Sequence, residues 1–156
     1  MKKTYIIVVI SLLITTMTAC KKDNNDNPKD YEGVWELAET SSMMPTQLYD
    51  PGNGNLLSIN SDGSYVYSKN DSVTETGNYK VVTDNSVEEN VCLKDLKDKY
   101  KERFAFSNIS TPYAVYPANY KVFFYVADDK LYMIGGCFAV DGGSYRVYRR
   151  LKVYAM

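Results

Sequence analysis

From Tyr31 onward, apolar and polar residues alternate in short runs separated by turn residues. A period of two is typical of β-strands that bury one face. In 33–40, for example, Trp35 and Leu37 share one face and Glu36 lies on the other. Closing many short strands into one barrel leaves no exposed sheet edges, so the pattern predicts an all-β fold, a single small antiparallel meander β-barrel. Further strands are expected over 56–60, 65–68, 73–82, 104–109, 120–127, 130–134 and 144–154.

One segment departs from the β pattern. Residues 94–103 are highly charged, and Leu96 and Tyr100 are spaced by four. That spacing places both side chains on one face of a helix. The segment therefore predicts one short helix near 94–103.

The N-terminus has the order of a secretory signal peptide. Two lysines precede the apolar run 5–14, and small polar residues lead to Cys20. The run is shorter than the ~20 residues that span a bilayer, which disfavours the alternative of an uncleaved anchor. The stretch Met17-Thr18-Ala19-Cys20 resembles a bacterial lipobox, with Met17 where leucine is usual. The resemblance implies cleavage after residue 19 and acylation of Cys20, which would anchor the chain to a membrane.

The segment that follows Cys20 is polar and lacks apolar residues other than one proline. Such a composition cannot offset the entropy of ordering, so 20–30 is expected to be a lipidated cysteine and flexible tether. Its Lys-plus-acid start resembles the signals that send lipoproteins of Bacteroidetes to the outer membrane surface. A plain solvated spacer is the alternative. The expected organisation is thus a signal peptide over 1–19, the tether over 20–30 and a barrel domain over 31–156, located in the cell envelope.

Composition excludes several function classes. The chain contains no histidine, which removes Ser-His-Asp catalysis and His-ligated metals. With no catalytic set or metal-ligand set in view, we expect neither an enzyme nor a cofactor. A net charge of −1 gives no basic footprint for nucleic acid. Cys92 and Cys137 form an even pair in an exported chain, which favours a disulfide over two free thiols.

Two ends of the domain resemble lipocalin-like domains of bacterial lipoproteins of the Bacteroidetes type. Gly33-Val34-Trp35 opens the first strand, Arg149-Arg150 lies in the last, and 60–79 resembles that group's second to fourth strands. The resemblance implies a barrel closed by an arginine packed over Trp35. Alternation puts Tyr145, Val147 and Arg149 on the apolar face of the last strand, so Arg149 is the expected partner and Arg150 the alternative.

A second small barrel family offers another interpretation. Intracellular fatty-acid-binding proteins also begin with Gly-x-Trp and end with an Arg-x-Tyr that grips a carboxylate, and Arg146-Val147-Tyr148 matches that ending. The same alternation points Arg146 and Tyr148 outward, however, and the Pro- and Gly-rich loop over 43–54 does not suit that family's helix pair.

Two features suggest surface roles. Tyr113, Tyr116, Tyr120 and Tyr125 gather around a Pro-flanked loop and form a candidate recognition patch, although tyrosine is also a common strand residue. Asp71-Ser72-Val73 resembles an O-glycosylation motif of Bacteroidetes and falls on an expected turn. The leading hypothesis is a lipid-anchored binding protein for a small or hydrophobic ligand. The alternative is a filled barrel whose loops contact a protein or glycan.

Overall fold

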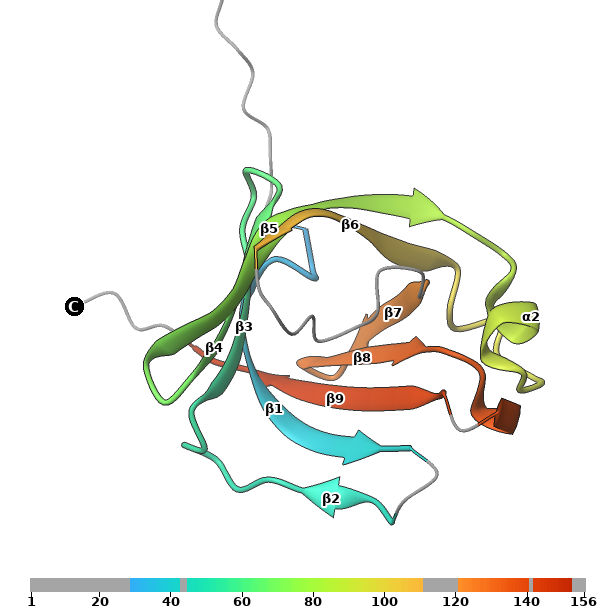
Figure 1. The fold of residues 1–156 in the computed structure, drawn as a ribbon, viewed down its shortest axis with the longest axis horizontal. Coiled ribbons are helices and arrows are strands. Elements are labelled where there is room, and N and C mark those ends of the chain that lie inside the picture. The colour runs from blue at the N-terminus through green and yellow to red at the C-terminus, as the bar shows by residue number, and fades with distance from the viewer. Residues whose placement is uncertain (1–28, 43–44, 111–120, 141, 153–156) are drawn as a thin grey trace, which may run out of the picture.

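In the computed structural model, the described residues are 29–42, 45–110, 121–140 and 142–152. The strands among them are β1 (Gly33–Ser41), β2 (Gln47–Leu48), β3 (Asn55–Ile59), β4 (Ser64–Lys69), β5 (Ser72–Thr83), β6 (Glu102–Ser110), β7 (Val122–Ala127), β8 (Lys130–Gly135) and β9 (Ser144–Arg150). Neighbours in sequence pair antiparallel from β3 to β9, and β1 pairs with both β3 and β9 (Figure 1). The sheet therefore closes into an eight-stranded meander barrel, which confirms the predicted all-β fold.

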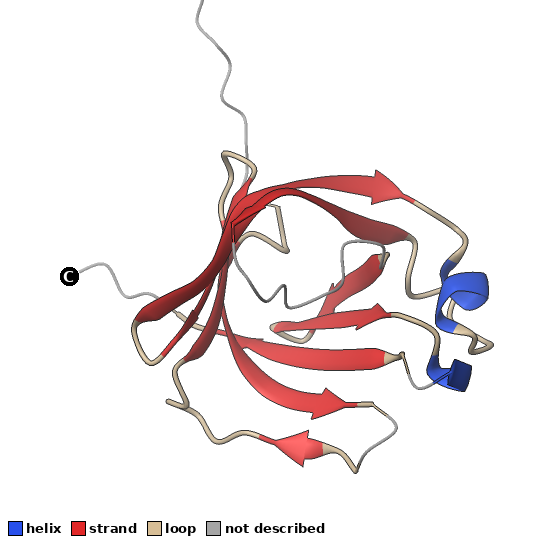
Figure 2. Ribbon diagram, in the orientation of Figure 1, coloured by secondary structure: helices blue, strands red, loops and turns tan. Residues whose placement is uncertain are grey.

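Strand β1 holds the closure together because three strands pair with it. Its first part, Gly33 to Glu36, faces β3, and its last part pairs with the short β2. The ladder between β1 and β9 has a register shift between Leu37 and Glu39. Such a bulge bends the strand and helps a small sheet curl into a barrel. Figure 2 shows that strands account for almost all the regular structure of the described residues.

Two hairpins have tight turns whose chemistry is readable in the sequence. Asn70 and Asp71 join β4 to β5, with φ of 50° and 63°, and Asp128 and Asp129 join β7 to β8, with φ of 51° and 55°. Two successive positive φ values are the mark of the type I′ turn, which matches the twist of the strands it connects. Asn and Asp adopt this conformation more readily than other non-glycine residues.

The barrel interior is filled with aromatic side chains over much of its length. Trp35, Leu57 and Met133 have no exposed surface, and the Phe104 and Phe124 rings stack with centroids 3.9 Å apart. The buried residues that share this inner cluster are Tyr31, Trp35, Leu37, Leu57, Ile59, Tyr65, Tyr67, Tyr79, Phe104, Val122, Phe124, Leu131, Met133 and Tyr148. Their burial is the main source of stability of the fold.

One end of the barrel is closed where β1 begins and β9 ends. Tyr31 enters the core from that end, and its ring meets Tyr79, Phe104 and Phe124 edge to face. The Trp35 Nε1–H donates a 2.8 Å hydrogen bond to the Tyr31 carbonyl. Tyr31 therefore plugs this end of the barrel, while Lys29 and Asp30 are exposed.

Arg150, not Arg149, covers this closed end. The Arg150 guanidinium carbon lies 4.1 Å from the centre of the Trp35 ring, and Nη1 donates to the Glu32 carbonyl at 2.9 Å. Nη2 donates to the Asp30 carbonyl. The predicted Trp35–Arg149 contact is wrong, because the inner face of β9 carries Tyr148 and Arg150, with Tyr148 only 2% exposed.

The outer face of β7, β8 and β9 is apolar for a separate reason. The short helix α2 (Val87–Val91) packs against it, so that Val87, Val91, Tyr100, Phe123 and Ile134 form a second buried cluster, partly lined by Tyr145. Because this cluster covers the outer face, apolar residues of β9 such as Tyr145, which were expected to face the core, lie on the outside of the barrel.

The helix predicted near 94–103 is also misplaced. Residues 94–101 form bends and turns, residues 102 and 103 begin β6, and α2 lies earlier in the chain. Leu96 and Tyr100 still face the same outer cluster, but from a turn: the Lys99 and Tyr100 amides both donate to the Leu96 carbonyl.

The predicted disulfide is confirmed, since Cys92 and Cys137 are bonded with their Cα atoms 5.0 Å apart. It ties the end of α2 to the loop between β8 and the 3-10 helix η1 (Phe138–Val140).

Several predicted features lie outside the described residues: the signal peptide over 1–19, Cys20, the tether up to 28, and Tyr113, Tyr116 and Tyr120. Within the described ranges, no helix has the length and apolar character needed to cross a bilayer.

Candidate functional site

Arg146 and Tyr148 point into the barrel. Tyr148 belongs to the inner cluster, and Arg146, two residues earlier on β9, shares its face. The cross-strand partners of Arg146 are Thr40 on β1 and Met133 on β8, and Met133 is fully buried inside the barrel. The sequence-based expectation that both residues point outward is therefore wrong, and the objection it raised against an interior Arg-x-Tyr pair falls away.

The structure has a cavity of about 140 Å³ beside this pair, toward the end of the barrel opposite Trp35. Leu37 and Tyr148 supply apolar surface, and Tyr67, Thr74 and Arg146 supply polar groups. A second, larger cavity of about 300 Å³ adjoins Thr40, Gln47 and Ser144, and Arg146 lines it as well. Arg146 thus stands between two spaces at one mouth of the barrel. We call these two spaces and their lining the mouth site.

Polar groups continue inward from the mouth site. The Tyr65 hydroxyl donates a 2.7 Å hydrogen bond to Glu75, which is only 4% exposed and pairs across the strands with Tyr67. Burial, together with the neighbouring Glu75 carboxylate, raises the pKa of Tyr65 well above its ordinary value. Tyr65 therefore stays protonated at neutral pH and serves as a hydrogen-bond donor.

The filled core limits what the mouth site can hold. Ligand pockets for drug-sized molecules usually measure about 300–1,000 Å³, and the inner of the two spaces falls below that range. Beyond it lie the buried rings of Tyr65, Phe104 and Trp35. The arrangement suits a small molecule with an acidic group at Arg146 and a short apolar part against Leu37 and Tyr148.

Arg149 has a structural task on the outside of the barrel. It forms an ion pair with Glu36 at 3.6 Å and donates to the Tyr49 carbonyl. Glu36 is 2% exposed and accepts a 2.9 Å hydrogen bond from the Gly52 amide. The pair therefore pins the loop between β2 and β3 to the barrel wall.

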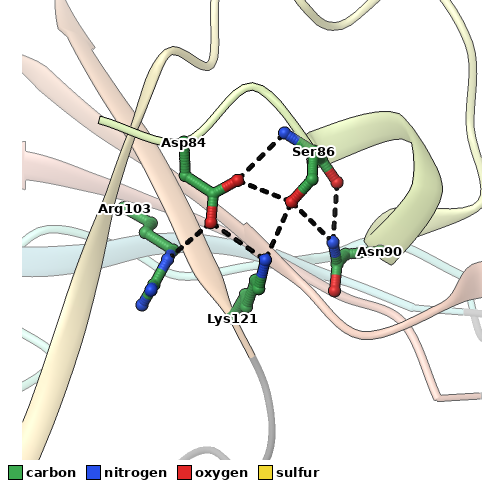
Figure 3. Close-up of polar contacts among 5 residues, drawn as sticks. All are labelled: Asp84, Ser86, Asn90, Arg103 and Lys121. Carbon is green, nitrogen blue, oxygen red and sulfur yellow. Dashed lines mark hydrogen bonds and ion pairs between the residues drawn. The ribbon is translucent and has the colours of Figure 1, made fainter. Parts of the chain in front are cut away.

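A network of five residues joins the α2 segment to the barrel (Figure 3). The Asp84 carboxylate accepts hydrogen bonds from Ser86, from Arg103 Nε at 2.7 Å and from Lys121 Nζ at 2.9 Å. Burial alone would raise the pKa of Asp84, but the hydrogen bonds from Ser86, Lys121 and Arg103 outweigh it and hold the pKa well below its ordinary value. With its carboxylate fully engaged, this network is a clamp for α2 and not a site for a ligand.

Of the four tyrosines in the predicted recognition patch, Tyr125 is the one within the described residues. Its ring stacks on Tyr132 with centroids 4.4 Å apart and meets Tyr100 edge to face at 4.9 Å. Sequence reasoning missed Tyr132 and Tyr100. Counting back from the Asp128-Asp129 turn pairs Tyr125 with Tyr132, so the hairpin signal could have found the first of them.

The predicted glycosylation residue, Ser72, is exposed at the start of β5, directly after the Asn70-Asp71 turn. Among the described residues, no three acidic or cysteine side chains gather in a way that could hold a metal ion.

In comparisons with known proteins, no family model matches the chain and no curated protein sequence is significantly similar to it.

Proposed function

We propose that this chain is a lipid-anchored, lipocalin-like binding protein that holds a small ligand by an acidic group at the mouth site. The observation that carries the proposal is the position of Arg146, on the inner face of the barrel and between two cavities. A guanidinium presents several donors in one plane and binds a carboxylate through two hydrogen bonds at once.

The shape of the interior sets the size of the proposed ligand. Leu37 and Tyr148 offer apolar contact next to Arg146, and the aromatic core blocks deeper entry. A short- to medium-chain acid or a single-ring acid satisfies both conditions. A long-chain fatty acid does not, because the buried rings of Phe104 and Trp35 fill the interior beyond the mouth site.

An envelope location is part of the proposal. It is supported by the signal-like order of residues 1–19 and the lipobox-like junction at Cys20. The Cys92–Cys137 disulfide agrees with it, since disulfides persist in oxidising compartments. Display at the outer membrane surface, and glycosylation of the exposed Ser72, extend the same proposal.

Calorimetric titration with octanoate, octanamide, benzoate and palmitate tests the ligand. Octanoate and benzoate should bind, octanamide should bind at least tenfold more weakly because it lacks the charge, and palmitate should gain nothing over octanoate. Arg146→Gln should weaken octanoate binding by about tenfold or more. Lys80→Gln, an exposed change on β5, should leave it unaltered. Equal binding of octanoate by wild type and Arg146→Gln would contradict the proposal.

The second candidate is a filled barrel that acts through its surface. The packed Trp35, Phe104 and Phe124 side chains favour it, because a ligand carrier usually keeps a larger interior space. If no small acid binds, this candidate becomes the better account of the fold.

A further inference from the structure

The larger cavity of the mouth site is lined mostly by neutral hydrogen-bonding groups. Its volume of about 300 Å³ reaches the usual range for small-molecule pockets. Thr40, Gln47 and Ser144 line it with hydroxyl and amide groups, with further serines and one proline beside them. Among the described residues of its lining, Arg146 is the one that carries a charge. This space, which we call the outer cavity, therefore offers one cation surrounded by neutral donors and acceptors.

The pairing of three strands places three of these polar side chains in one row. Arg146 on β9 is the cross-strand partner of Thr40 on β1, and Thr40 is in turn the partner of Gln47 on β2. Directly opposed residues share a face of the sheet, with their Cβ atoms about 5 Å apart. Because Arg146 is on the inner face, Thr40 and Gln47 are on that face too.

The inner face of the barrel becomes more polar toward this mouth. One row deeper, the buried Leu37 and Tyr148 oppose each other and supply apolar surface. Thr40 and Arg146 form the next row, and Ser144 lies two residues before Arg146 on the same face of β9. A plain fatty acid held at Arg146 matches the deeper apolar row but offers nothing to the hydroxyl and amide groups of the outer cavity.

The nearest acidic residue of β1 does not alter the charge of the outer cavity. Glu39 opposes Val147, whose side chain lies on the other face of β9 from Arg146. The Glu39 carboxylate is therefore on the outside of the sheet. A carboxylate ligand at Arg146 meets no like charge from this part of the wall.

We propose that the mouth site takes a polyhydroxylated carboxylic acid, a sugar acid, whose carboxylate binds Arg146 and whose hydroxyl groups bind Thr40, Gln47 and Ser144. This inference rests on the proposed function, which supplies the contact between the carboxylate and Arg146. Hydroxyl and amide side chains both donate and accept hydrogen bonds, as the hydroxyl groups of a sugar do. A site built of such groups discriminates strongly against an analogue without hydroxyls, because the polar groups then lose their partners.

Calorimetric titration with three six-carbon compounds tests the proposed ligand class. Gluconate has both the carboxylate and the hydroxyl groups, hexanoate has only the carboxylate, and glucitol has only the hydroxyl groups. Gluconate should bind at least tenfold more tightly than either of the others, since it alone engages Arg146 and the neutral groups together.

Thr40→Val removes one hydroxyl and keeps the shape of the side chain. It should lower the ratio of the gluconate affinity to the hexanoate affinity by about fivefold, which corresponds to one lost hydrogen bond. Thr83→Val is the matched control, because Thr83 is exposed at the far end of β5, and it should leave the ratio as in wild type. Thermal melting of both variants shows that they fold.

Nuclear magnetic resonance supplies a second readout, since the side-chain amide signal of Gln47 should shift with gluconate and less with hexanoate. Equal affinities for gluconate and hexanoate would overturn the inference and leave the proposed function standing. Gluconate bound no more tightly than glucitol, or a ratio that Thr40→Val does not change, would overturn it as well. If octanoate and gluconate both fail to bind, the proposed function itself is refuted.

Discussion

Replacing Arg150 with alanine should lower the free energy of unfolding by about 3 kcal/mol. The guanidinium lies 4.1 Å from the centre of the Trp35 ring, and a desolvated cation–π contact contributes about 1–2 kcal/mol. The hydrogen bonds to the Glu32 and Asp30 carbonyls add about 1.5 kcal/mol, since both come from a charged donor near the surface. The ion pair with Asp129 adds little, because that carboxylate is 70% exposed.

A double-mutant cycle isolates the stacking contact. Trp35→Ala should cost about 3–5 kcal/mol as a large truncation in the core. The double variant with Arg150→Ala should be milder than the sum by about 1–2 kcal/mol, because neighbouring residues couple. Arg149→Ala is the matched control: it removes an arginine one position earlier, on the other face, where it pairs with Glu36. Its cost should add to that of Trp35→Ala within about 0.5 kcal/mol.

Urea unfolding of the soluble chain from Lys21 onward, followed by circular dichroism, measures all five variants. Coupling of Trp35 to Arg149 in place of Arg150 would refute the assignment of the two faces of β9. Additivity of Trp35 and Arg150 would show that the stacking contact contributes nothing to closure.

Three further predictions concern other parts of the chain. Removing the disulfide by Cys92→Ala with Cys137→Ala should destabilise the domain by up to about 4 kcal/mol, because the bond closes a long loop. Urea unfolding measures the loss, and an unchanged unfolding midpoint would contradict this prediction. The pKa of Asp84 is lowered in the folded state, so its contribution to stability is complete above about pH 4 and is lost as the pH falls further. Asp84→Asn should therefore make the loss of stability in acid less steep when unfolding is measured against pH. An unaltered pH profile would count against the clamp. Cys20→Ala should move the protein from the membrane fraction to the soluble fraction, and continued membrane partitioning would rule out the lipid anchor.

The barrel itself could be predicted because its signals are local. The Asp128-Asp129 turn and the alternation around Trp35 are each set by a few neighbouring residues, and the structure keeps both. The disulfide could be predicted from the even number of cysteines together with the expected export of the chain. These features needed no knowledge of which distant segments meet.

The facing of β9 could not be predicted in the same way, because both of its faces are partly apolar. Tyr145 and Val147 gave the impression of a core face, yet Tyr145 packs under the α2 segment, whose position depends on the disulfide and on Asp84. The mouth site could not be predicted either, because Arg146 and Tyr148 share a face of β9 that was expected to point outward. When a segment distant in sequence covers the outside of the barrel, both faces of a strand become apolar. The alternation of that strand alone then does not identify its inner face.

In the proposed function, Arg146 holds a small acid at one mouth of a barrel whose other end is filled. Titration of the isotope-labelled protein with octanoate, followed by nuclear magnetic resonance, tests it most directly. Amide signals of Thr40, Arg146 and Tyr148 should shift with one saturating curve, and the Trp35 indole signal should stay in place, because its ring lies in the closed end. A shift of the Trp35 indole with no shift at Arg146, or no shift at all, would contradict the claim.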